Sequence, residues 1–203
     1  MFSLSLLLIG CAGVEGVKPI VQVEIREPSG LEIETEGKGR EISVRIPFEG
    51  GLETCGMQKD SFYLDVGTVR CTDNPAAALA DLLVKQLRKA GFKVQTGAIP
   101  TKATTVQIEG ELLLFFTEPV GKGGSETDVH LQLTARSGTG LDAERTFYEK
   151  GRGGDAQRSV NSGVRRILQT MLGAIIELMD DYPMLGRSST SVPKKPSNPE
   201  QSP

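Results

Sequence analysis

Two stretches between residues 106 and 135 alternate apolar and polar residues, which is the pattern of strands with one buried face, and a third strand is expected at 145–150. The apolar positions of the first stretch are Val106, Ile108, Gly110, Leu112, Leu114 and Phe116, and those of the second are Val129, Leu131, Leu133 and Ala135. The third stretch, residues 145–150, carries Phe147. Gly-containing turns at 121–124 and 138–140 separate the three. The sequence therefore predicts an antiparallel meander with one buried and one wetted face.

A first helix is expected over residues 76–90. Asn74 suits its N-cap, because the side chain can accept hydrogen bonds from free amides of the first turn. Pro75 follows at a position where no needed donor is lost. Gly91 supplies a left-handed stop.

A second helix is expected over residues 156–181, where apolar residues recur at helical intervals. Gly163 and Gly173 interrupt this stretch, and each costs about 1 kcal/mol relative to Ala in a helix interior. We therefore expect both glycines where the helix approaches the sheet closely.

The first half of the chain predicts shorter strands, at residues 21–25, 31–34, 42–46, 62–69 and 92–96. Two of these, 31–34 and 42–46, flank a Gly-containing turn and predict a hairpin. The continuous apolar run at 62–69 suits a central strand, paired in parallel with 92–96 through a right-handed crossover.

Residues 112–116 are apolar at every position, which favours a buried central strand over the alternative of a half-exposed binding face. Together, these elements predict an α/β (α+β) fold. It is a two-layer sandwich of a mostly antiparallel sheet with two helices packed on one face.

The N-terminus resembles a bacterial lipoprotein signal peptide. A short apolar run, residues 4–9, precedes Gly10-Cys11. This resemblance implies cleavage before Cys11 and attachment of lipid, typically palmitate, to its thiol. The first basic residue is Lys18, so we expect the cationic start of the signal upstream of Met1. The alternative is a buried N-terminal strand with Cys11 as a core thiol.

A membrane-spanning helix does not fit this N-terminal run, because spanning takes about 20 apolar residues. Ala12 after the cysteine resembles the pattern of lipoproteins sent to the outer membrane. We therefore expect a signal peptide at residues 1–10 and a lipidated tether at 11–20. A single domain at 21–182 and a disordered polar tail at 183–203 would follow.

Cys55 and Cys71 remain after Cys11 is set aside. In an oxidising compartment an even remainder predicts a disulfide, and two free thiols are the alternative.

Composition and motifs give little indication of a nucleic-acid partner, a metal site or a catalytic site. The net charge is -3 and the chain has no Trp, which disfavours a nucleic-acid partner. The single histidine, His130, lacks the further ligands of a metal site. A hydrolase using His130 with Asp128 is an alternative, but no Gly-x-Ser-x-Gly elbow accompanies it. The Gly cluster at 121–125 joins two strands and suits a turn rather than a phosphate loop. We expect no enzyme activity, no cofactor and no metal.

Several segments resemble the YajG-type family of bacterial lipoproteins. The similarity runs over about residues 66–181. The segments that carry it are Leu87-Arg88-Lys89-Ala90-Gly91-Phe92-Lys93-Val94, Val106-Gln107-Ile108, the strands around 129–135, Arg145-Thr146-Phe147-Tyr148 and Val160-Asn161-Ser162. The resemblance implies an outer-membrane lipoprotein with a two-layer α/β domain and no assigned catalytic residue. A weaker resemblance is to auxiliary lipoproteins of lipid-transport ABC systems.

These features predict a lipid-anchored, non-catalytic protein on the periplasmic side of the outer membrane. Its expected partners are the membrane, through the anchor, and another envelope protein. The alternative is an accessory lipoprotein of a lipid or lipopolysaccharide ABC transport system, which predicts exposed apolar surface.

Overall fold

The computed structural model describes residues 18–29, 31, 37–45, 54–60, 62, 64–97, 102–120, 123–183 and 185–186. Within these ranges the strands are β1 (Ile20–Val23), β2 (Glu41–Val44), β3 (Gly56–Lys59), β4 (Asp65–Cys71), β5 (Lys93–Thr96), β6 (Val106–Val120), β7 (Gly124–Arg136) and β8 (Asp142–Gly153). The helices are α1 (Pro75–Lys89) and α2 (Ala156–Asp181). The signal peptide, Cys11 and most of the predicted tail lie outside the described residues. No helix of the described chain is both long and apolar enough to cross a bilayer.

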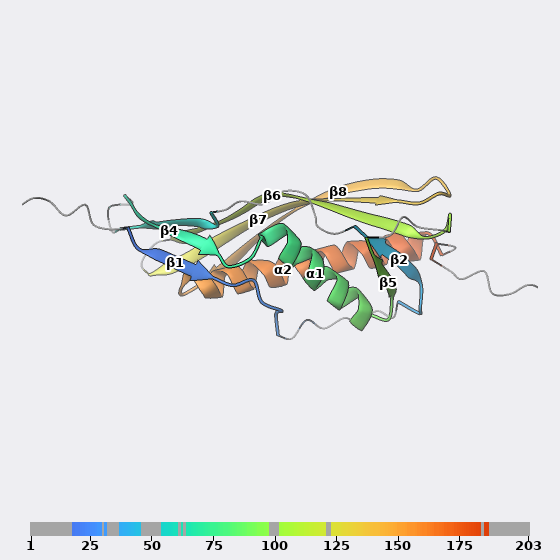
Figure 1. The fold of residues 1–203 in the computed structure, drawn as a ribbon, viewed down its shortest axis with the longest axis horizontal. Coiled ribbons are helices and arrows are strands. Elements are labelled where there is room, and N and C mark those ends of the chain that lie inside the picture. The colour runs from blue at the N-terminus through green and yellow to red at the C-terminus, as the bar shows by residue number, and fades with distance from the viewer. Residues whose placement is uncertain are drawn as a thin grey trace, which may run out of the picture.

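All the strands join one curled, mixed sheet (Figure 1). β6, β7 and β8 form the predicted antiparallel meander. Outside the meander, β3 and β4 form an antiparallel hairpin. The other pairs are parallel: β1 with β4, β2 with β5 and β6, and β3 with β6. The expectation of a mostly antiparallel sheet is therefore wrong. Parallel pairs need crossover connections between distant segments, and short alternating runs do not indicate which distant segment they pair with.

The predicted partners of the short strands are also wrong. β2 has β5 on one edge and β6 on the other, so neither edge remains for a hairpin with residues 31–34. Residues 32–36 lie outside the described chain. β5 pairs with β2 rather than with β4, so the strands on either side of α1 are not the two halves of one crossover.

A β-bulge at Leu113 divides the long strand β6. Before it, Ile108 and Leu112 face the core. After it, Phe115 is fully buried while Leu114 and Phe116 turn to the outer face. The predicted alternation through Leu114 and Phe116 therefore fails, because one extra residue reverses which side chains face inward. The apolar run arises from this change of face and not from burial on both faces.

α1 begins and ends as its sequence predicts. The Asn74 side chain accepts hydrogen bonds from the amides of Ala76 and Ala77, at 2.9 and 3.2 Å. Gly91 follows the helix with φ +84°. Two amides of the first turn thus find a partner in one side chain, which typically stabilises a helix by about 1 kcal/mol.

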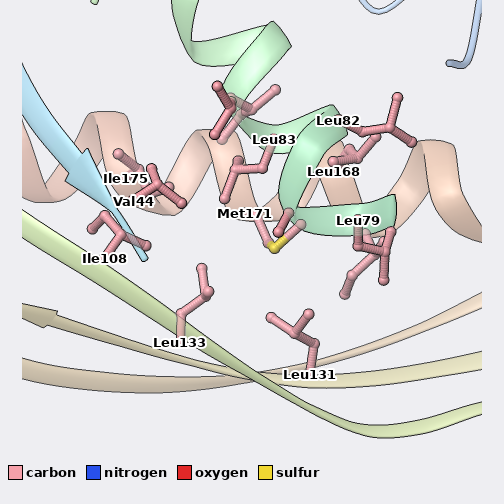
Figure 2. Packing of buried hydrophobic residues seen from close by; sticks show 14 of the residues in the cluster. Val44, Leu79, Leu82, Leu83, Ile108, Leu131, Leu133, Leu168, Met171 and Ile175 are labelled. Atoms are coloured by element: carbon pink, nitrogen blue, oxygen red, sulfur yellow. The ribbon is translucent and has the colours of Figure 1, made fainter. Parts of the chain in front are cut away.

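The core lies between the sheet and the two helices, which share one face of the sheet (Figure 1). Figure 2 shows side chains of both helices converging above the inner face of the sheet. The contributors include Leu79 and Leu83 of α1, Leu168, Met171 and Ile175 of α2, and Val44, Ile108, Leu131 and Leu133 of the sheet. Each fully buried side chain of this size contributes roughly 1.5–3 kcal/mol.

α2 approaches the meander at a pair of glycines. A Cβ on Gly151 of β8 would lie 2.1 Å from the amide nitrogen of Gly163. A Cβ on Gly163 would lie 3.3 Å from Val129 and 3.5 Å from Thr127, both on β7, as predicted for a close approach. Gly173 does not serve this purpose, because a Cβ there would meet nothing within 4 Å.

The folded domain continues past the boundary predicted at residue 182. Leu185 is buried, and the Gly186 amide donates to the Thr104 carbonyl at 2.8 Å. The Gly186 carbonyl accepts from Glu41 of β2, also at 2.8 Å. At the other end of the sheet, a disulfide joins Cys55 and Cys71, whose Cα atoms are 5.6 Å apart.

Candidate functional site

The two residues of the hydrolase alternative lie together on the outer face of β7. Asp128 and His130 are two positions apart, and Tyr148 of β8 lies opposite His130. The Tyr148 hydroxyl donates to Asp128 Oδ1 at 2.9 Å, and its ring meets His130 edge to face at 5.7 Å. No hydrogen bond within the described chain reaches the His130 ring. A general base held by a carboxylate is therefore not assembled here.

Charged neighbours complete this cluster as a network of ion pairs. Glu126 accepts from Lys150 and from Arg152, the latter at 2.7 Å, and Lys150 also lies 2.9 Å from Asp128. The hydrogen bond from Lys150, supported by Arg152, lowers the pKa of Glu126 below its usual value. Glu126, Tyr148 and Asp128 together raise the pKa of Lys150 above its usual value. Both groups stay charged at neutral pH, which suits cross-strand pairing and not proton transfer.

A cavity of about 510 Å³ lies at the C-terminus of α2. Its lining residues are Lys38, Gly39, Arg40, Lys93, Asp180, Pro183 and Gly186. Arg40 donates to the Met179 carbonyl at 2.7 Å and to Asp180 at 3.0 Å, and it stacks over Phe92. A cation there satisfies the negative end of the helix dipole, so Arg40 has a structural explanation.

Metal and buried-nucleophile chemistry find no support in the described part of the chain. No three His, Cys, Asp or Glu side chains there gather as a metal site. The buried hydroxyls of Thr117, Thr127 and Ser159 bond to one another at 2.9 and 2.8 Å. Ser159 Oγ also donates to the Ala156 carbonyl. The three hydroxyls are therefore hydrogen-bonded and link α2 to the sheet.

The surface that stands out is apolar. Most of the large apolar side chains exposed on the described chain belong to β1, β3, β4 and the turn between β3 and β4. We call this surface the apolar patch and define it as Ile20, Met57, Phe62, Leu64 and Val66. Ile20 and Met57 both lie opposite Thr68, which is two residues from Val66 on β4. Ile20 and Met57 therefore share the outer face of the sheet, opposite the helices, and Val66 lies at the register shift between β3 and β4.

Asp60 shapes the tip of the apolar patch. Its carboxylate accepts from the amides of Phe62 and Leu64 at 2.8 and 3.0 Å. The Asp60 amide also donates to the Leu64 carbonyl at 3.0 Å. This tight turn leaves Phe62 81% exposed and Leu64 64% exposed. The prediction of a buried central strand at 62–69 is therefore wrong at its start, and an Asp that closes a turn was the available signal.

The apolar patch lies at the end of the molecule where β1 begins. β1 and β4 are parallel, so the turn before β4 and the chain before β1 lie at the same end (Figure 1). The Thr68 amide donates to the Pro19 carbonyl at 3.1 Å, which fixes the entering chain beside the apolar patch.

An apolar cleft lies between α2 and the strands β6, β7 and β8. It is lined by residues such as Leu133, Phe147 and Ile175, and its volume is about 30 Å³. A space of this size holds about one water molecule and not an acyl chain.

Comparisons with known proteins show the fold only. Neither a family model nor a curated protein matches this sequence. The structure of XCC0632 from Xanthomonas campestris, described as a DUF330 protein, matches with a TM-score of 0.56 and 11% identity. The match covers 81% of this chain and 99% of that one. At this identity the likeness establishes a shared fold and no shared activity.

Two further solved structures resemble the chain more loosely. The PelC dodecamer from Paraburkholderia phytofirmans matches with a TM-score of 0.40 and 11% identity, over 76% of this chain and 92% of that one. Lipoprotein GNA1162 from Neisseria meningitidis matches with a TM-score of 0.31 and 12% identity, over 70% of this chain and 99% of that one. Neither likeness carries a functional argument. The comparisons therefore establish for this chain an α+β fold with a curled, mixed sheet, and no family.

Proposed function

We propose that this protein is a non-catalytic, lipid-anchored component of the cell envelope, on the periplasmic side of the outer membrane. In this proposal the apolar patch rests on the bilayer to which Cys11 is anchored. The observation that carries it is the position of the apolar patch, beside the segment through which an N-terminal anchor would join the domain.

The distances favour this arrangement. Residues 11–19 span at most about 30 Å when fully extended. An anchor at Cys11 would therefore hold Pro19, and the apolar patch beside it, within reach of the bilayer interface. Burying Phe62 and Leu64 would contribute about 3 kcal/mol in total, at the low end of roughly 1.5–3 kcal/mol for each side chain. That alone is marginal for binding, but the tether raises the local concentration.

The shape of the apolar patch favours a membrane over a protein as its first contact. Phe62 and Leu64 project from a turn, whereas stable protein interfaces usually take about 800 Å² of matched surface from each partner. Apolar side chains at a projecting turn enter the lipid interface without such a surface. The predicted protein partner would then bind a surface other than the apolar patch.

An accessory role in a lipid or lipopolysaccharide transport system is the second candidate. The exposed apolar patch favours it, since such a role needs apolar surface. The small cleft beside α2 weighs against a version that encloses an acyl chain. Detergent-extracted protein examined by native mass spectrometry tests this role. Co-purified lipid beyond the covalent acyl groups would favour it over simple anchoring.

Replacing Cys11 with Ser should abolish the anchor. We expect wild-type protein, expressed in a Gram-negative host with labelled palmitate, to incorporate label and to float with membranes. The Cys11→Ser variant should incorporate none and remain in the soluble fraction, because no thiol is available for acylation. Cys55→Ser/Cys71→Ser serves as the matched control and should keep its label. Equal labelling of wild type and Cys11→Ser would remove the anchor from this account.

A further inference from the structure

The outer edge of β8 is open in the described structure. β8 pairs with β7 on one side, and no described strand lies on the other. This edge is 12 residues long, and about half of its backbone amides and carbonyls point away from β7. Long open edges are templates for pairing with another strand.

The order of charges along β8 selects its partner. Going along the strand, Asp142 and Glu144 come first, and Lys150 and Arg152 come last on the same face. The opposite face carries Arg145 before Glu149. Each face thus has one sign in its first half and the other sign in its second half. An antiparallel copy of the same strand reverses that order.

We propose that β8 pairs antiparallel with β8 of a second copy of this chain, centred on Phe147. This register places Asp142 opposite Arg152, Glu144 opposite Lys150, and Arg145 opposite Glu149. Twofold symmetry makes each pair occur twice. Opposite charges that face each other across strands are favourable, and like charges are unfavourable.

Other registers lose this match. Moving the centre to Thr146 keeps only Asp142 opposite Lys150. Moving it to Tyr148 keeps only Glu144 opposite Arg152. Charged residues on an edge often serve to prevent pairing. Here their order gives three kinds of opposite-charge pair in one register and only one in each neighbouring register, so it favours one partner and one register.

The helix beneath β8 leaves room for the second copy. Thr170 of α2 donates to Glu149 at 2.7 Å, and Glu177 of α2 accepts from Arg145 at 2.7 Å. Gly173 lies between these two positions on the same stripe of the helix, level with Phe147. A side chain there would meet nothing within 4 Å. The two α2 helices would therefore come closest where neither has a side chain.

The symmetry also agrees with the proposed function, although the dimer does not depend on it. A centre on one residue places the twofold axis perpendicular to the sheet. Both copies then present their outer faces, with the apolar patch on each, toward the same side. Two anchors could therefore meet one bilayer.

Charge exchange between copies tests this pairing. The full chain carrying Cys11→Ser removes association through lipid and is compared by sedimentation over a concentration series. We expect it to form a dimer. Glu144→Lys and Lys150→Glu, each added alone, should weaken the dimer by about tenfold or more, because each places two like-charge pairs across the axis. An equimolar mixture of the two variants should restore it, since every pair is then opposite in sign.

Glu111→Lys is the matched control, because Glu111 is exposed on β6, two strands away from the edge. It should leave the dimer unchanged. Lys150→Glu also removes the ion pair with Glu126, so folding is checked by circular dichroism. If that variant is unfolded, Asp142→Arg and Arg152→Asp replace the first two substitutions. Each is made alone, and the two variants are then mixed. A monomer at all concentrations, or a dimer insensitive to charge reversal and not restored by mixing, would overturn the proposal. The palmitate-labelling test of the proposed function uses the chain that keeps Cys11, so its outcome is independent of this one.

Discussion

Replacing Gly151 with Ala should lower the free energy of unfolding by about 3 kcal/mol, near the upper end of overpacking effects. The added Cβ would lie 2.1 Å from the Gly163 nitrogen and 2.2 Å from the Ser159 carbonyl oxygen. These are backbone atoms of α2, so no side chain can rotate away to relieve the clash. The helix would have to move off β8, which loosens its packing on the meander.

For a domain of this size such a loss corresponds to a fall in Tm of roughly 6–12 °C. Thermal melts of wild type and Gly151→Ala check it. Gly154→Ala is the matched control, three residues along the chain, because a Cβ there would meet only the end of the Arg158 side chain at 3.7 Å. It should change stability by no more than about 1 kcal/mol. Equal behaviour of the two variants would show that α2 does not approach β8 as described.

Removing the disulfide should cost about 3 kcal/mol, the value expected for a closed loop of about 15 residues. The double variant Cys55→Ala/Cys71→Ala is made in the chain that carries Cys11→Ser, so no thiol remains to form wrong bridges. The bond joins the residue before β3 to the end of β4, and therefore holds the hairpin that carries the apolar patch. Urea unfolding of wild type and variant, without reductant, measures the loss.

Reductant separates the effect of the bond from that of the substitutions. Wild type treated with dithiothreitol should lose nearly the same stability as the double variant, while the double variant should not respond. Peptide mapping under non-reducing conditions identifies the bridge directly. An unchanged midpoint for wild type on reduction, together with free thiols at both positions, would contradict the bond.

Local signals in the sequence predicted local structure well. The N-cap at Asn74, the stop at Gly91 and the span of α2 follow from interactions within a few residues, which the sequence displays directly. The meander could be predicted equally well, because its strands are long and consecutive in the chain. The pairing of Cys55 with Cys71 was expected from counting and is present in the structure.

Strand pairing between distant segments could not be predicted from the sequence. β2 lies between β5 and β6, and neither is its neighbour in sequence. The bulge at Leu113 was hidden because five consecutive apolar residues look the same on either face. Gly173 looked like a packing glycine for the same reason as Gly163, since only the tertiary contact distinguishes them.

The apolar patch was hidden for a related reason. Phe62 and Leu64 carry the composition of a core strand, and burial of apolar residues is the usual expectation. Their exposure follows from the turn at Asp60, which ends the apolar run on the surface. Among the sequence-based candidates, His130 and Asp128 do lie together. The Asp128 carboxylate, however, accepts a hydrogen bond from Tyr148 and forms an ion pair with Lys150.

A single tryptophan tests most directly whether the apolar patch meets the membrane. The chain has no Trp, so Phe62→Trp introduces the only one, and Tyr182→Trp is the matched control at the far end of α2. That helix has 26 residues and spans roughly 39 Å. The lipidated full chain is reconstituted into vesicles of phospholipids with brominated acyl chains. Our account predicts blue-shifted, strongly quenched emission from Trp at 62 and unquenched emission from Trp at 182. Water-like emission from both, or equal quenching of both, would contradict it.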